Sequence, residues 1–311
     1  MKILVTGGGG YVGTRLVNKL LDLDYEVVVV DIFWFPNFLK KRKNLKIIRK
    51  DIINLKNIDL KNVNTIIHLA SIANDPASNL DPKLTWEISC QGTMHLCELS
   101  KKNKIKKFIF ASSGSVYGIK KEKNVTENLS LLPISDYNKT KMVAERVILS
   151  YKKFFSCFII RPGTVFGYSE KMRLDLMINI LTFQAMTKNV IQVFGGKQTR
   201  PFIHISDMVD IYIFFLKSKK KPGIYNASYG NLSALKTAKE IKKIFKKCKI
   251  NIKKSNDPRS YRLSSQKLVR AGFKFKVSLR EGINELKKYF EVGKIKNTKS
   301  AYSINWIKSK K

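Results

Sequence analysis

Tyr137 and Lys141 are the two residues whose types and spacing most directly indicate chemistry. Side chains four positions apart lie on one face of a helix. A phenol has a pKa of about 10 and is a poor base at neutral pH, but a nearby ammonium group favours its ionised form. The pair therefore predicts a tyrosine that exchanges a proton with a substrate hydroxyl. An ordinary pair on an exposed helix face is the alternative, because this spacing is common.

Three serines follow the apolar run at 107–111, in a turn that contains Ser112, Ser113 and Ser115. A hydroxyl at the end of a buried strand is well placed to hydrogen-bond the same substrate oxygen as the tyrosine and to fix its orientation. The turn is thus a second part of a predicted active site.

A glycine-rich turn near the N-terminus predicts a dinucleotide site, with Gly7, Gly10 and Gly13 between a strand and a helix. These glycines permit a tight turn, close approach of a pyrophosphate and close packing of the helix on the strand. Asp31 ends the next strand, where a carboxylate accepts hydrogen bonds from a ribose 2′-hydroxyl and repels a 2′-phosphate. The pattern favours NAD over NADP, and a glycine turn that binds no ligand is the alternative.

The elements that must hold these residues alternate between short apolar runs and helix-period segments. This alternation predicts a Rossmann-type α/β fold with a doubly wound parallel sheet. Strands are expected at 2–6, 25–31, 45–49, 64–69, 107–112 and 156–161, and helices at 11–23, 83–102 and 138–152.

Past Gly167 the alternation loosens, which predicts a smaller α/β lobe. We expect residues 1–167 to form the nucleotide-binding domain, with 201–217 returning to it. The smaller lobe is expected from 168–200 and 218–291, with helices at 172–188, 233–247 and 278–291. Residues 292–311 are rich in lysine and weakly patterned, which predicts a solvated basic tail.

Charge is the most unusual feature of the composition: 60 Lys and Arg stand against 23 Asp and Glu, a net charge of +37. Such a charge is typical of proteins that bind nucleic acid. However, the basic residues are mostly lysine and are spread along the whole chain, whereas base recognition favours arginine at defined places. A general bias in residue usage is therefore the preferred interpretation, and no nucleic-acid partner is expected.

Several classes of protein are excluded or disfavoured. The 44% hydrophobic content supports a sizeable core and excludes a disordered chain. No apolar run reaches the roughly 18 residues of a membrane span, and no signal-peptide pattern precedes the strand at Lys2, so a cytoplasmic protein is expected. The four cysteines lack metal-ligand spacing and are expected to be reduced core residues, with no metal site.

Taken together, the motifs resemble those of the extended short-chain dehydrogenase/reductases, specifically the NAD-dependent epimerase/dehydratase family of nucleotide-sugar enzymes. The resemblance covers about residues 1–290 and consists of TGGGGYVG, HLAS, SSGSVYG, YNKTK, RPGTVFG and RPFIHISD in this order. It implies NAD as cofactor, a nucleotide-sugar site between two lobes, and a homodimer formed through helices matching 83–102 and 138–152.

The resemblance also assigns roles to the three catalytic candidates. Tyr137 is implied as the acid/base, and Lys141 as the residue that tunes it and positions the ribose. Ser113, rather than Ser112, is implied to orient the reacting oxygen because it stands four residues before Tyr117.

Further cofactor and substrate contacts are expected around these residues. The expected cofactor contacts beyond the glycines and Asp31 are Tyr11, Val12, Asp51, Ile52, Leu69, Ala70, Ser71, Tyr137, Lys141 and Pro162. The expected substrate contacts are Asn74, Ser113, Ser115, Tyr137, Thr164, Arg200 and Arg259, the two arginines matching the family's diphosphate-binding positions. The alternatives are that Asp51 is a simple cap, that Asn74 is an ordinary turn residue and that Arg200 pairs with Asp207. His68 and Arg161 are expected to be packed, and Arg262 is either a diphosphate ligand or a surface charge.

Gly114 and Ser115 mark a departure from part of the family. Dehydratases of the family have an Asp-Glu pair here and decarboxylases have an acid at the second position, whereas a serine hydroxyl is a weak acid near neutral pH. This favours an epimerase acting at C4 of a nucleoside-diphosphate hexose, through a 4-keto intermediate with transient NADH. The alternatives are a reductase of a nucleotide-4-keto-6-deoxyhexose and a non-catalytic RNA-binding relative.

Overall fold

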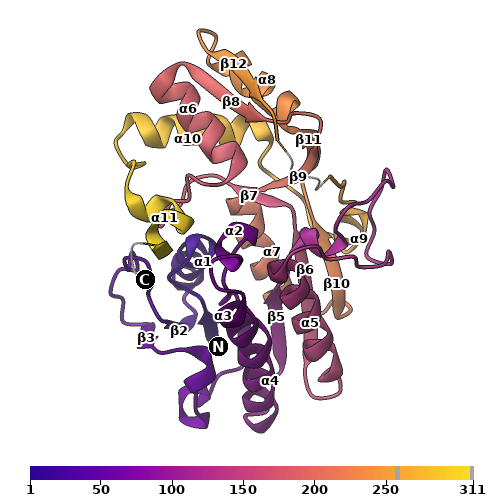
Figure 1. Cartoon of the computed structure of the whole chain (residues 1–311). Coiled ribbons are helices and arrows are strands. Elements are labelled where there is room, and N and C mark those ends of the chain that lie inside the picture. The colour runs from indigo at the N-terminus through magenta and orange to yellow at the C-terminus, as the bar shows by residue number, and fades with distance from the viewer. Residues whose placement is uncertain (256–259, 309–311) are drawn as a thin grey trace.

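The computed structural model describes residues 1–255 and 260–308 (Figure 1). Its central sheet contains β1 (Lys2–Thr6), β2 (Glu26–Asp31), β3 (Leu45–Arg49), β4 (Thr65–His68), β5 (Lys107–Ala111), β6 (Ser156–Pro162) and β10 (Gly223–Ala227). Within the described residues these seven strands are parallel, in the order β10-β6-β5-β4-β1-β2-β3. The strand order reverses between β1 and β4, and such a reversal opens a ligand crevice at the carboxyl ends of the strands. The predicted Rossmann-type fold is confirmed.

Helices cover both faces of this sheet, which explains the apolar runs in its inner strands. On one face lie α1 (Tyr11–Asp22) and α7 (Ile205–Lys217), and on the other lie α4 (Gly92–Lys102) and α5 (Asp136–Ser150). Successive residues of β1 alternate accordingly: Ile3 and Val5 join the core under α1 and α7, and Leu4 joins the core under α4 and α5. Within the described part of the chain, no helix has both the length and the apolar character needed to cross a bilayer.

The long helix expected over 83–102 is divided in the structure. It consists of α3 (Pro82–Trp86), a π-helical turn (Glu87–Gln91) and α4, and it follows the short helix α2 (Asp75–Ser78). Gly92 lies at the end of this turn, where an added Cβ would be 2.6 Å from Cδ1 of Ile52. The glycine therefore allows the helix to pack closely on the short 3₁₀ helix Ile52–Asn54.

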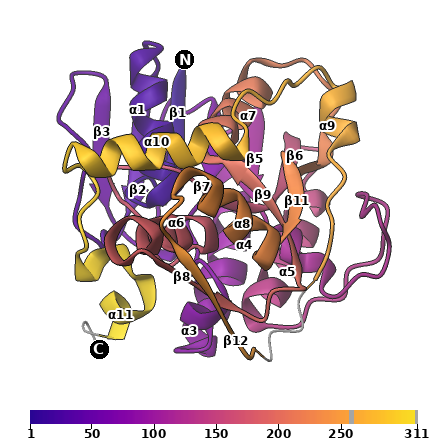
Figure 2. The ribbon, with the colours of Figure 1, turned by 90° about the horizontal axis from the view of Figure 1, so that it is seen from above.

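A smaller lobe lies above the carboxyl ends of the central strands in Figure 1. One of its sheets joins β7 (Thr164–Phe166), β9 (Thr199–His204) and β11 (Gly230–Ser233), and the other joins β8 (Val190–Phe194) and β12 (Lys249–Lys253). Its helices are α6 (Met177–Lys188), α8 (Ala234–Ile244) and α10 (Leu279–Glu291), and Figure 2 shows α10 extending across this lobe. Leu181, Ile191, Ile241 and Ile283 belong to its core.

Two expected boundaries between the lobes were wrong. Strand β10, expected in the smaller lobe, pairs with β6 in the central sheet, and α9 (Gln266–Arg270) packs on it. The physical reason is its apolar face, since Tyr225 packs against Phe215 in the core of the larger lobe. Conversely, of the segment 201–217 only helix α7 returns to the larger lobe, because β9 pairs with β7 and β11.

The expectation of a solvated tail was also wrong for residues 292–308. Ile295, Ala301 and Ser303 are buried, and the chain forms a short 3₁₀ turn (Lys299–Ala301) followed by α11 (Ser303–Lys308). A few apolar side chains among many lysines were enough to anchor this part of the chain. We refer to residues 299–308 as the C-terminal segment.

The four cysteines are free thiols, as expected. Cys97, Cys157 and Cys248 are buried and Cys90 is partly buried. Burial raises the pKa of each thiol, so none of the four is activated as a nucleophile.

Candidate active site

A cavity at the carboxyl ends of the central strands brings the predicted site residues together. It is lined by all the predicted cofactor contacts: Gly7, Gly10, Tyr11, Val12, Gly13, Asp31, Asp51, Ile52, Leu69, Ala70, Ser71, Tyr137, Lys141 and Pro162. It is also lined by the predicted substrate contacts Asn74, Ser113, Ser115, Thr164 and Arg200. Arg259 lies outside the described residues. The residues were correctly predicted to share one site, while their individual roles stay predictions.

The glycine-rich turn joins β1 to α1 by very close backbone packing. Gly7 has a φ of +72°, and a Cβ there would lie 2.6 Å from the backbone nitrogen of Ala70. A Cβ on Gly13 would lie 2.3 Å from the carbonyl oxygen of Gly7. No side chain caps the N-terminus of α1 at Gly10, and Gly10 to Gly13 line the cavity, so the first N–H groups of the helix are suited to binding an anion there.

Asp31 is held in place at the end of β2 by two backbone groups. Gly9 N–H donates to its Oδ2 at 2.9 Å, and Phe33 N–H donates to its Oδ1 at 2.7 Å. Burial raises the pKa of this carboxyl group, and the two hydrogen bonds oppose that shift. Both interpretations of Asp51, as a cap and as a cavity residue, agree with the structure. Its side chain accepts the N–H of Ile53 as a cap and also lines the cavity.

Helix α5 presents Tyr137 and Lys141 on the face that meets the cavity. The helix begins two residues earlier than expected, because Ser135 caps it by accepting the N–H of Asn138. The ammonium group of Lys141 donates to the carbonyl oxygen of Ala111 at 2.8 Å and lies 6.0 Å from the centre of the Tyr137 ring. Lys141 is buried and Tyr137 is partly buried, so the pair is not the ordinary surface pair considered as the alternative.

The pKa of Tyr137 differs from the sequence expectation. Burial, and to a smaller extent the charge of Asp75, raise it to about 12 against the opposing effects of a hydrogen bond from Ser113 and the charge of Arg173. The cost of burying a phenolate dominates, and Lys141 does not produce the lowering expected from the sequence.

Lys141 is itself strongly affected by its surroundings. Burial lowers its pKa to about 7, and the carboxylate of Glu145 opposes this shift. The residue therefore changes its charge near neutral pH, which makes it sensitive to any charged ligand in the cavity.

Ser112 and Ser113 have clearly different environments. The hydroxyl of Ser112 is buried and donates to Glu145, whereas that of Ser113 contacts Ser115 at 2.6 Å and Tyr137. The structure therefore supports the preference for Ser113 as the residue next to the reacting oxygen.

A chain of polar side chains continues from Ser113 away from Tyr137. Ser115 donates to the side-chain oxygen of Asn138, whose amide donates to Asp75 at 2.9 Å. Ser135 also donates to Asp75. This network holds the hydroxyl of Ser115 on protein groups, so its expected contact with substrate stays a prediction.

Arg161 and His68 are buried structural residues near the predicted catalytic group, as expected. Arg161 forms a buried ion pair with Glu145 at 2.6 Å and also donates to the hydroxyl of Tyr117 at 2.7 Å. His68 is fully buried between Thr6 and Thr93, and burial lowers its pKa to about 3.

The structure places the two described arginines of the expected diphosphate site, Arg200 and Arg262, differently. Asp207, the alternative partner of Arg200, accepts the N–H groups of Lys276 and Val277, while Arg200 lines the cavity. Arg262 is exposed and is not part of the cavity lining, which favours its interpretation as a surface charge.

Comparison with known proteins agrees with this geometry. The model of the NAD dependent epimerase/dehydratase family matches residues 3–228. The chain belongs to this family.

Similar proteins in the epimerase/dehydratase family are named for different activities. A putative UDP-glucose 4-epimerase of Methanocaldococcus jannaschii is 29% identical over 91% of this chain and 96% of the relative. A UDP-glucuronic acid 4-epimerase of Bacillus cereus, solved with UDP-glucuronic acid and NAD, has a TM-score of 0.85 and 30% identity, covering 94% of this chain and 99% of that one. An NAD-dependent NDP-hexosamine 5,6-dehydratase of tunicamycin biosynthesis also has a TM-score of 0.85, with 25% identity over 94% and 98% of the two chains.

NAD is the cofactor of the family, and the cavity fits it. The uncapped N-terminus of α1 suits the pyrophosphate, and the fixed carboxylate of Asp31 suits an adenosine ribose without a 2′-phosphate. Lys141 lines the cavity beside Tyr137, and its contact with the second ribose stays a prediction. The prediction of NAD is confirmed.

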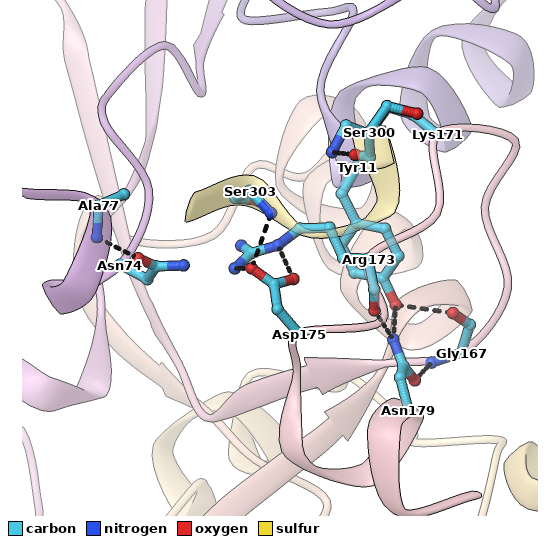
Figure 3. A network of polar contacts seen from close by, with 10 residues as sticks. All are labelled: Tyr11, Asn74, Ala77, Gly167, Lys171, Arg173, Asp175, Asn179, Ser300 and Ser303. Atoms are coloured by element: carbon cyan, nitrogen blue, oxygen red, sulfur yellow. Dashed lines mark hydrogen bonds and ion pairs between the residues drawn. The ribbon is translucent and has the colours of Figure 1, made fainter. Parts of the chain in front are cut away.

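Sequence reasoning missed a group of charged residues at the junction of the two lobes (Figure 3). Arg173 lines the cavity and forms a two-bonded ion pair with Asp175, at 2.9 and 3.0 Å. Asn179 joins this group to the cofactor turn, because its amide contacts the hydroxyl of Tyr11 at 3.2 Å and the carbonyl oxygen of Arg173 at 2.8 Å. The only sequence signal was a charged run inside an otherwise apolar stretch, which predicts a loop as readily as a site.

Proposed function

We propose that this protein is an NAD-dependent nucleotide-sugar epimerase that acts at C4 of a nucleoside-diphosphate hexose or hexuronate. The observation that carries this proposal is the convergence of Tyr137, Ser113 and Lys141 in one cavity beside the glycine-rich turn. Similar proteins are named for UDP-glucose and UDP-glucuronic acid, which supports a UDP-sugar as the first candidate substrate.

Ser113 and Tyr137 have different roles in the transfer of one proton. Ser113 fixes the C4 hydroxyl, and Tyr137 removes its proton as C4 becomes a ketone, then returns a proton when the hydroxyl forms again. Bound NAD would supply the acceptor for the C4 hydride and the donor that returns it to the other face of the ketone, and its positive charge near the phenol would counteract the raised pKa of Tyr137. Lys141 and Arg173 add positive charge around the same group.

Elimination of water is disfavoured at the position where family dehydratases have their acidic pair. Gly114 has no side chain, and the hydroxyl of Ser115 is engaged with Ser113 and Asn138. Neither residue supplies a proton donor of the strength that expulsion of a hydroxide requires.

The first test of this proposal is Tyr137→Phe. We expect turnover of the active UDP-sugar to fall by at least about a hundredfold, the usual contribution of an acid/base group, with NAD binding retained. Tyr151→Phe is the matched control, because Tyr151 directly follows the same helix and its hydroxyl bonds Glu98. Near-normal turnover in Tyr137→Phe would remove this residue from the mechanism.

The substrate and the alternative functions are separated by one set of assays. Thermal stabilisation by UDP-, dTDP-, GDP- and CDP-sugars identifies the nucleotide, since a ligand stabilises the state that it binds. An epimerase then interconverts two sugars without net change in the cofactor, whereas a 4-ketoreductase consumes reduced cofactor in proportion to product. Salt-sensitive RNA binding with no turnover of any nucleotide sugar would instead support an RNA-binding relative.

One observation favours dehydration as a second candidate. Asp75 lines the cavity close enough to Tyr137 to raise its pKa, so a carboxylate is present near the reacting carbon atoms. If the sugar binds against Tyr137, this group, which also accepts hydrogen bonds from Ser135 and Asn138, is suited to removing a proton from a carbon next to a ketone. Reaction in D₂O decides between the two: C4 epimerisation through NAD leaves no deuterium on carbon, and dehydration introduces it at C5 or C6.

A further inference from the structure

The C-terminal segment forms part of the wall of the NAD cavity. Ser303 and Ile307 line the cavity together with Trp34 and Phe35, which follow Asp31 in the chain. Asp31 marks the position of the adenosine ribose, so this wall lies beside the adenosine half of the cofactor site.

Contacts with the larger lobe hold the segment on this side. The indole nitrogen of Trp306 donates to the carbonyl oxygen of Trp34 at 2.6 Å, and its ring stacks on Phe35 with the ring centres 6.2 Å apart. Helix α11 lies against α2, and Ile307 packs on the apolar core that contains Ile52 and Ala77.

Contacts with the smaller lobe hold the segment on the opposite side (Figure 3). Leu174 N–H donates to the carbonyl oxygen of Ala301 at 2.8 Å, and the N–H of Ser303 donates to Asp175 at 3.2 Å. Lys171, which is 2% exposed, donates to the carbonyl oxygen of Ser300 at 3.3 Å while its ammonium group lies 3.6 Å from the centre of the Phe35 ring. Asp175 also holds Arg173, so the segment is tied to a charged group that lines the cavity.

We propose that the C-terminal segment is a cofactor-retaining element of this enzyme, which covers the adenosine half of NAD and must detach from the loop at Trp34 and Phe35 before NAD leaves. The proposal rests on the confirmed cofactor and is independent of the reaction at C4. Its chemical basis is the apolar side chain of Ile307 in the cavity wall, on a segment that Trp306 joins to the larger lobe and Ser303 to the smaller one.

Ile307→Ala and Trp306→Ala test the proposal through NAD release. Ile307→Ala removes apolar surface from the wall, and Trp306→Ala removes the hydrogen bond to Trp34 and the stacking on Phe35 that hold the segment. For each variant we expect the rate of NAD dissociation to rise about tenfold with little change in the association rate. Stopped-flow displacement of NAD gives both rates with no sugar substrate present. Ile58→Ala is the matched control, because Ile58 is 65% exposed in the larger lobe and does not line the cavity.

A folding control separates retention from general damage. Thermal unfolding without NAD should place Ile307→Ala close to the unmodified protein, since its side chain is only partly buried. Deletion of residues 299–311 should produce a larger increase in NAD release than either point variant. Unchanged NAD dissociation in the deletion variant, with the fold intact, would overturn the proposal, and loss of turnover in Tyr137→Phe would leave it untouched.

Discussion

At the scale of single residues, the site depends on charges that the protein buries at a cost. Lys141 is 2% exposed and its pKa falls to about 7, whereas the same group in an unfolded chain has a pKa of 10.5. The surroundings that prepare Lys141 for catalysis therefore also reduce the stability of the fold when it is protonated.

Lys141→Met makes this cost measurable. Between pH 7 and pH 10.5 the unfolded chain binds a proton at Lys141 that the folded chain has released, so the stability of the unmodified protein rises with pH in this window. The free energy of unfolding of the variant should exceed that of the unmodified protein by most at pH 6. This excess should fall by about 1 kcal/mol per pH unit from pH 7 to pH 9. Urea unfolding without NAD, performed on both proteins at each pH, measures the difference. A difference independent of pH would show that Lys141 keeps its ordinary pKa.

Residue types and spacing were enough to predict which side chains share the cavity, but not their electrostatics. Tyr137, Lys141 and Ser113 could be found because motif spacing fixes positions on a helix and at the end of a strand. The raised pKa of Tyr137 could not be predicted, because it depends on burial and on Asp75, a residue 62 positions away in the chain whose approach only the fold determines.

At the scale of elements, the turn between β1 and α1 is the part of the fold with least tolerance for change. Atoms of the turn and the helix are in contact through the backbone itself, so no rotamer change relieves an added methyl group. This tightness is what places the N-terminus of α1 against the cofactor cavity.

Gly13→Ala should destabilise the protein by about 1–3 kcal/mol, the usual cost of overpacking, because its Cβ would meet the carbonyl oxygen of Gly7 at 2.3 Å. Gly92→Ala is the matched control in another helix. There the first contact is Cδ1 of Ile52, the end of a flexible side chain, and alanine also favours the helix by up to about 1 kcal/mol. Urea unfolding without NAD compares the two variants. Equal stability of both would contradict the role given to backbone packing at Gly13.

Elements with a strong apolar pattern were predictable, and elements defined by distant partners were not. The central strands and the helices α1 and α5 of the first 160 residues follow their hydrophobic periodicity closely, whereas the helix expected over 83–102 is divided. Strand β10 was assigned to the wrong lobe because a short strand does not show which sheet it joins. The ordered C-terminal segment was missed because it is held by contacts with Trp34 and with the loop at 171–175, which are distant in the sequence.

At the scale of the whole molecule, the expected homodimer stays a prediction. Helices α4 and α5 pack side by side on one face of the central sheet, and Met94 on α4 is 51% exposed. These are the helices through which the family resemblance implies dimerisation.

Light scattering tests the dimer directly. We expect a mass twice the 35.7 kDa of one chain, and Met94→Glu should shift it toward the monomer because a charge would be buried at the contact. Ile252→Glu, at a site 58% exposed on the smaller lobe, should leave the mass unchanged. A monomer at every protein concentration would exclude the dimer, and an unaltered dimer in Met94→Glu would place the interface elsewhere.

The contact between Trp34 and Trp306 also sets an order of events during protein synthesis. These residues are 272 positions apart, and contacts across so long a loop form late because closing the loop costs entropy. A growing chain that has completed only β1 to β6 already contains the glycine-rich turn and Asp31, yet it lacks the wall that encloses them. We therefore expect NAD to exchange freely with the nascent chain and to become trapped only when synthesis reaches α11.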